Sequence, residues 1–144
     1  MIHVSDILQK KGPKVASVAG TTSVVEAARR MNADHIGSVV VTEGERVVGI
    51  FTERDVLNRI VAAGRDPAQT RVADVMTTPV ACCRGDTKLD ECRRVMREKR
   101  IRHLPVVEGG RLVGMISIGD LNAFEAKEQA ETIHYLSEYL YGRT

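Results

Sequence analysis

Apolar and polar positions follow two different periods along the chain, and their order predicts alternating helices and strands. Residues 24–34 carry apolar side chains on one face at helical spacing, and Ser23 with Glu26 is typical of a helix N-terminal capping box. Residues 36–42 form a β-branched apolar run, which indicates a strand buried on both faces. After a turn, the expected elements are a returning strand at 46–52 and a closing helix at 53–64.

The same pattern recurs 65 positions further along the chain. Residues 15–61 align with residues 80–126 without a gap, and 15 of the 47 aligned positions are identical. The chain is therefore two copies of one unit, each read as strand, helix, strand, strand, helix. Neither copy can bury a full core alone, so we expect the two to pack sheet against sheet in one module of the α+β or α/β class. The expected divisions are 1–66 for the first repeat, 67–127 for the second and 128–144 for a C-terminal helical extension.

The composition is compatible with this fold and excludes few functions by itself. Of the 144 residues, 43% are hydrophobic and 28% are charged, which is ordinary for a globular protein. The net charge of +2 is too small to indicate a nucleic-acid-binding surface, and we interpret the basic run at 93–103 as a solvated helix face. No apolar run reaches the length of a membrane span and the N-terminus lacks an apolar leader, so the sequence predicts a cytoplasmic protein with no membrane partner.

The sequence offers little support for catalysis or metal binding. Its three cysteines, Cys82, Cys83 and Cys92, include no C-x-x-C pair and are interpreted as reduced packing residues. The sequence shows no nucleophile with a neighbouring base, no G-x-x-x-x-G-K-[ST] phosphate loop and no cluster of metal ligands. We therefore expect a protein that is not an enzyme and that requires no metal or cofactor.

One short motif occurs in both repeats, at Gly49–Asp55 and at Gly114–Asp120, and reads Gly-hydrophobic-x-[Ser/Thr]-x-x-Asp. On the residues alone, Thr52 and Ser117 are helix N-caps, and the Asp three positions later completes a capping box. The free amides of such a helix N-terminus keep the carboxylate ionised, and they can also receive a phosphate. A carboxylate has several acceptor positions, so capping and ligand contact can coexist.

The order of helix, "IGSVVV", turn and "VVGIFTERDVL", given twice, resembles the cystathionine β-synthase (CBS) domain, here as the tandem pair known as a Bateman module. The resemblance extends from about residue 4 to residue 126. It implies clefts between the repeats that hold an adenosine-containing ligand: AMP, ADP, ATP, NAD or S-adenosylmethionine. In such pairs the Asp accepts hydrogen bonds from the ribose hydroxyls, and the Thr or Ser hydroxyl holds ribose or phosphate.

The resemblance also assigns residues to two unequal clefts. The first cleft comprises Thr52, Arg54 and Asp55, the facing residues Arg102 and His103, and backbone from Val80 to Cys82 near adenine. The second cleft comprises Ser117 and Asp120, the facing residues Gly37 and Ser38, and backbone from Val15 to Ser17 near adenine. Cations suited to a phosphate therefore gather in the first cleft, whereas the second offers hydroxyls and backbone. For His103, a surface histidine without a ligand role remains the alternative.

The predicted function is that of a regulatory, energy-sensing module that binds an adenosine nucleotide and acts on a separate, unidentified effector protein. The alternatives are a sensor of NAD or S-adenosylmethionine, and a module for protein or nucleic-acid interaction whose clefts do not function. A homodimer that associates through helices is also expected. An apolar stripe in residues 121–141 would contribute to it, unless this segment folds back on its own repeats, and the stripe consists of Leu121, Phe124, Ile133, Leu136 and Leu140.

Overall fold

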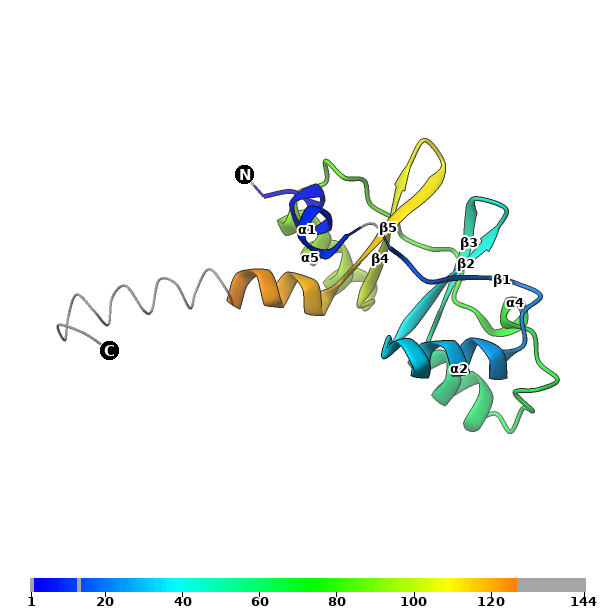
Figure 1. Cartoon of the computed structure of the whole chain (residues 1–144). Helices are drawn as coiled ribbons and strands as arrows, with labels where there is room; N and C mark the ends of the chain where they lie inside the picture. The colour runs from blue at the N-terminus through cyan, green and yellow to red at the C-terminus, as the bar shows by residue number, and fades with distance from the viewer. Residues whose placement is uncertain (1, 13, 127–144) are drawn as a thin grey trace, which may run out of the picture.

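The structure is a computed structural model that describes residues 2–12 and 14–126 (Figure 1). Residues 118–126 are helical and follow directly on the last strand. The other elements are α1 (Val4–Lys11), β1 (Ser17–Ala19), α2 (Val24–Asp34), β2 (Ser38–Glu43), β3 (Arg46–Thr52), α3 (Glu53–Asp55), the π-helix η1 (Val56–Val61), α4 (Val72–Val75), α5 (Leu89–Lys99), β4 (His103–Glu108) and β5 (Arg111–Ser117).

The two repeats have the predicted order of elements but differ in their first strand. In the first repeat β1 runs parallel to β2, and β2 pairs with β3 antiparallel. In the second repeat β4 and β5 form the antiparallel pair, and the segment equivalent to β1 is reduced to a bridge between Cys83 and Val106. Pro105 explains the difference. Its counterpart Val40 donates its N–H to Ala16 O at 3.0 Å, whereas a proline has no N–H to donate.

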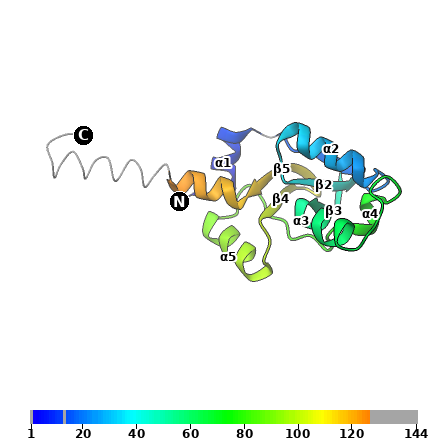
Figure 2. The ribbon, with the colours of Figure 1, turned by 90° about the horizontal axis from the view of Figure 1, so that it is seen from below.

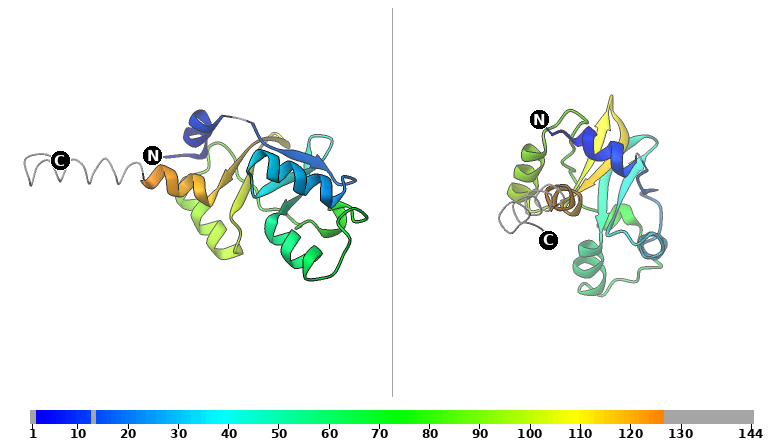
Figure 3. Two further views of the ribbon diagram at one scale, coloured as in Figure 1. Left: turned by 60° about the horizontal axis from the view of Figure 1, so that its bottom comes forward. Right: turned by 60° about the vertical axis from the view of Figure 1, so that its left-hand side comes forward.

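The two sheets pack together through the faces of their hairpins, which lie side by side in Figures 1 and 3. Val40 of β2, Ile50 of β3 and Met115 of β5 form the buried cluster that joins the repeats. Helices cover the remaining faces, with α2 and α3 on the first repeat and α5 on the second (Figure 2). The predicted packing of sheet against sheet is therefore confirmed, because neither sheet is covered without the other repeat.

Two helices outside the repeated segment complete the two cores. Helix α1 packs on the second repeat: Val4 N donates to Thr87 O at 2.9 Å, and Val4 and Ile7 belong to that repeat's buried cluster. Helix α4 occupies the equivalent place on the first repeat, where Val72 N donates to Thr22 O at 2.8 Å. The first repeat is therefore completed by a helix that follows it along the chain, and the second repeat by a helix from the N-terminal part of the chain.

The helix ends differ in part from the sequence-based expectation. Ser23 caps α2, because its Oγ accepts from Glu26 N at 3.2 Å. The expected closing helix 53–64 is shorter: α3 and η1 end at Val61, and Gly64 lies in the following turn with φ of 68°. In η1 the hydrogen bonds span five residues, as in Ala62 N to Leu57 O at 2.9 Å.

In the described part of the chain, no helix is long and apolar enough to cross a membrane. Of the predicted apolar stripe in the C-terminal segment, Leu121 is buried and Phe124 packs against the core of the second repeat. These two side chains therefore cover their own repeat. Ile133, Leu136 and Leu140 lie outside the described residues.

Candidate functional site

The first copy of the duplicated motif, at the end of β3, forms a helix cap. Strand β3 ends at Thr52 and α3 begins at Glu53. Thr52 N donates to Asp55 Oδ2 at 3.0 Å, and Asp55 N donates to Thr52 Oγ1 at 3.2 Å. This reciprocal pair satisfies two backbone N–H groups that a helix start leaves without partners. It also fixes the direction of the Asp55 carboxylate.

Asp55 is buried, with a side chain only 7% exposed, yet its carboxylate is well partnered. The hydroxyl of Thr77 donates to it at 3.0 Å from Oδ1 and 3.2 Å from Oδ2. Arg59 Nε lies 3.7 Å from Oδ1 and offsets the negative charge. Burial of a carboxylate without such partners would cost free energy. The structure therefore holds a fixed hydrogen-bond acceptor at the end of β3. The neutral hydroxyl of Thr77 uses part of the capacity of this carboxylate to accept hydrogen bonds.

Around this carboxylate lies a cavity of about 560 Å³ between the two repeats. The volume is in the range typical of small-molecule sites. Five of the residues assigned to the first cleft line its wall together, with Val80 as a sixth, and these are Thr52, Arg54, Asp55, Arg102 and His103. Cys82, also assigned to the first cleft, is not among the lining residues: it is exposed, and its Sγ contacts Val80 O at 3.8 Å. Val80 and Ala81 form the cavity wall at that point.

The wall of this cavity carries more positive than negative side chains. Four of the lining residues are Lys or Arg and two are carboxylates, Glu53 and Asp55. Burial lowers the pKa of His103 from its ordinary value, and the nearby charges of Arg102 and Lys11 lower it further. His103 is therefore a neutral hydrogen-bonding group at neutral pH, and the positive charge of the cavity comes from its arginines and lysine.

Sequence reasoning missed several residues that line this cavity, among them Lys99, Arg100 and Thr77. Lys99 ends α5 and Arg100 follows it with φ of 55°. Their counterparts in the first repeat are Asp34 and His35, so the change from an acidic to a basic residue at the first of these aligned positions was a usable signal. Thr77 gave no such signal, because it lies in the connection where the two repeats do not align without a gap.

The residues assigned to the second cleft are only partly brought together. Ser117 and Asp120 form the same reciprocal cap, with Ser117 N donating to Asp120 Oδ2 at 2.9 Å and Asp120 N to Ser117 Oγ at 3.1 Å. Gly37 lines the first cavity instead, and Ser38 is buried opposite Thr52 in the β2–β3 pair. Val15 and Ser17 line a separate cavity of about 590 Å³ beside the hairpin turns.

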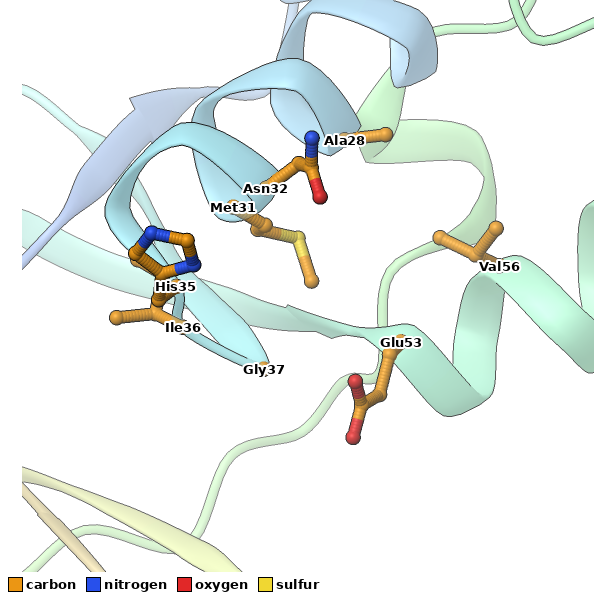
Figure 4. A pocket seen from close by; sticks show the side chains of 8 residues that line it. All are labelled: Ala28, Met31, Asn32, His35, Ile36, Gly37, Glu53 and Val56. Carbon is orange, nitrogen blue, oxygen red and sulfur yellow. The ribbon is translucent and has the colours of Figure 1, made fainter.

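A further groove lies on the helical side of the first repeat, between the end of α2 and the helix that starts at Glu53 (Figure 4). It measures about 450 Å³, and its wall includes Met31, Ile36 and Val56. Next to it, η1 exposes two large apolar side chains, Leu57 at 60% and Val61 at 66%. The groove wall mixes apolar side chains with polar ones such as Glu53, and Leu57 also lines the cavity between the repeats.

The chain thus contains two copies of one α/β unit, each with a capped carboxylate, and a charged cavity lies between them. The CBS domain family model matches residues 1–62 and residues 72–126, so the chain belongs to the CBS domain family. It is 31% identical to the "CBS domain-containing protein CBSX3, mitochondrial" of Arabidopsis thaliana, over 96% of this chain and 72% of that protein.

Solved structures give the same result. A CBS-domain containing protein from Agrobacterium tumefaciens superposes with a TM-score of 0.81 at 40% identity, over 86% of this chain and 99% of the other. A CBS domain protein from Pyrobaculum aerophilum, solved in complex with AMP, superposes with a TM-score of 0.75 at 31% identity. That match covers 83% of this chain and 90% of the other. The predicted fold and family are therefore confirmed.

Proposed function

We propose that this protein is a regulatory module that binds an adenosine nucleotide in the cavity between its repeats and transmits the binding to a separate partner. The carrying observation is that Asp55, with Thr52, faces Arg102 and His103 of the other repeat across one cavity of about 560 Å³. A carboxylate suits the two hydroxyls of a ribose, because each hydroxyl can donate a hydrogen bond to it. Arginine forks on the opposite wall suit a phosphate.

The charge of the cavity favours a nucleotide over the alternative ligands. AMP, ADP, ATP and NAD all carry phosphates that the four cationic side chains would attract. S-adenosylmethionine carries a cationic sulfonium instead, which the same side chains would repel. Apolar side chains on the wall, including Ile50, Val80 and Ile101, provide a surface for an adenine ring. The likeness to a relative solved with AMP supports the same class of ligand.

Regulation through binding, rather than catalysis, fits the chemistry of this wall. The lining carboxylates are a helix cap (Asp55) and an acid beside Gly37 (Glu53), and the lining histidine is neutral. A ligand that contacts both repeats would fix their relative position, and an effector protein could read that change. A cytoplasmic location remains a prediction. Direct binding of nucleic acid by the basic run at residues 93–103 stays the alternative function.

We also propose that two copies associate through their helices. The groove in Figure 4 and the exposed Leu57 and Val61 form an apolar face of the first repeat that a second copy could cover. A closed two-fold dimer is the commonest arrangement for such a face. The C-terminal extension, residues 128–144, would contribute to the interface in the predicted arrangement.

A thermal-shift panel on ligand-free protein tests the ligand class. We expect AMP, ADP, ATP or NAD to raise the melting temperature, since a ligand that binds only the native state stabilises it by mass action. S-adenosylmethionine is expected to have the smallest effect. If no member of the panel shifts the transition at millimolar concentration, the proposed function is wrong.

A further inference from the structure

The carboxylate of the second repeat already has a cationic partner from the same chain. Lys11 Nζ lies 2.8 Å from Asp120 Oδ2 and also donates to Met115 O at 2.9 Å. Both side chains are largely covered, at 35% exposed for Lys11 and 24% for Asp120. Burial raises the pKa of Asp120, but the hydrogen bonds from Lys11 and Ser117 outweigh it and hold that pKa below its ordinary value.

The first repeat handles the equivalent atoms differently. There Thr77 N donates to Ile50 O at 2.8 Å, and the Thr77 hydroxyl donates to the Asp55 carboxylate. Ile50 and Met115 are counterparts at the offset of 65 residues, as are Asp55 and Asp120. The Lys11 ammonium therefore makes, from the end of α1, the two bonds that the backbone and side chain of Thr77 make in the first repeat.

This exchange changes what the carboxylate can accept. A threonine hydroxyl is neutral and can rotate, so it can share Asp55 with an incoming hydroxyl and even accept a hydrogen bond from it. An ammonium is a donor only, and its hydrogen bond to a carboxylate is charge-assisted and about twice as strong as a neutral one. A ribose that approached Asp120 would have to displace that ammonium and would offer only neutral hydroxyls in return.

We propose that Lys11 closes the second cleft to nucleosides, so that the module binds one adenosine nucleotide and not two. This inference rests on the proposed function, because it takes the motif Asp to be the ribose acceptor. It adds that the C-terminal end of α1 supplies a tethered cation that occupies this acceptor. Lys11 is thus a specificity-determining residue of the second cleft.

Counting bound AMP by equilibrium dialysis, up to millimolar AMP, tests the proposal on four proteins. We expect one AMP per chain for wild type, none for Asp55→Ala, two for Lys11→Met, and one for the double variant Asp55→Ala/Lys11→Met. Methionine keeps the length and apolar stem of lysine without its charge. Loss of the charge-assisted bond should raise the affinity of the second cleft roughly tenfold or more. Lys14 is an exposed lysine between α1 and β1, so Lys14→Met is the matched control and should bind one AMP.

The outcomes separate this proposal from the proposed function. Two AMP on wild type, or none on the double variant, overturns the role of Lys11. One AMP bound by Asp55→Ala with the affinity of wild type also overturns it, because the nucleotide would then occupy a cleft that Lys11 is meant to close. If wild type binds none while the double variant binds one, the role of Lys11 stands and the assignment of the first cleft fails. Circular dichroism of each variant confirms that it is folded.

Discussion

At the scale of single residues, the site depends on two carboxylates with the same local geometry and different partners. Asp55 and Asp120 each form a reciprocal pair of capping hydrogen bonds with the residue three positions earlier. The sequence predicts these caps, because the spacing of Thr or Ser and Asp is local information. It does not predict that Thr77 contacts one carboxylate and Lys11 the other, since each contact joins segments with no aligned counterpart.

His103 should make the stability of the protein depend on pH in the weakly acidic range. Its pKa lies below the ordinary histidine value of about 6.5. The unfolded state therefore takes up a proton first as the pH falls, and the free energy of unfolding should decrease from about pH 7 downwards until the pKa of the folded state is passed.

Replacing His103 with glutamine removes this contribution. We expect His103→Gln to lose less stability than wild type between pH 7 and pH 5 in urea denaturation. At pH 8 both side chains are neutral, so the difference between the two proteins there provides the reference. Parallel decreases in the two proteins would show that the decrease has another source.

At the scale of elements, the period of apolar positions predicted the helices and strands, but not every end. The periods in residues 24–52 gave α2, β2 and β3 with their order and direction. In the first repeat Ser23 caps α2 as predicted, whereas in the second repeat α5 begins at Leu89 after Lys88, with no side-chain cap. The π-helix η1 also went unpredicted, because its 6 residues are too few to show a period different from that of an α-helix.

The glycine of the duplicated motif has a packing reason. A Cβ at Gly49 would overlap the Met76 side chain, 2.9 Å from Cγ, because β3 runs close to the segment that follows α4. In the second repeat a Cβ at Gly114 would lie 2.9 Å from Leu8 Cδ2 of α1. The glycines therefore allow each strand to approach the helix that completes its core.

Replacing Gly49 with alanine should therefore destabilise the protein by about 1–3 kcal/mol through overpacking. Adding Met76→Ala should recover part of the loss, because it removes the overlapping atoms. Gly119→Ala is the matched control: its Cβ would meet nothing closer than Ser117 Oγ at 3.5 Å, and its helical position should gain about 0.5–1 kcal/mol. Chemical denaturation of wild type and of the three variants measures these changes, and a Gly49→Ala protein as stable as wild type contradicts the packing explanation.

At the scale of the whole molecule, the duplication predicted that two small sheets would share one core. The cluster of Val40, Ile50 and Met115 confirms that contact. The predicted division at residues 66 and 67 separates the repeats along the sequence, while in space α1 packs on the second repeat and α4 on the first. An amphipathic pattern shows that a helix needs an apolar partner, but not which of two similar partners it will find.

The proposed dimer gives a prediction about assembly. Val61 is 66% exposed on η1, so Val61→Glu should leave the fold intact and weaken association through the helical face. Light scattering at micromolar concentration should give a dimer for wild type and a smaller species for Val61→Glu. A protein ending at residue 128 should also dimerise more weakly. Wild-type monomer contradicts the dimer, and an unchanged shortened protein removes the C-terminal segment from the interface.

The central claim is that the cavity beside Asp55 binds an adenosine nucleotide, and calorimetric titration of AMP into ligand-free protein tests it most directly. We expect wild type to bind and Asp55→Ala to lose most of its affinity, since each lost hydrogen bond to a charged group is worth about 1.5–3 kcal/mol at best. Asp120→Ala should show the smaller loss. No binding by wild type, equal losses, or a larger loss at Asp120 would contradict the claim.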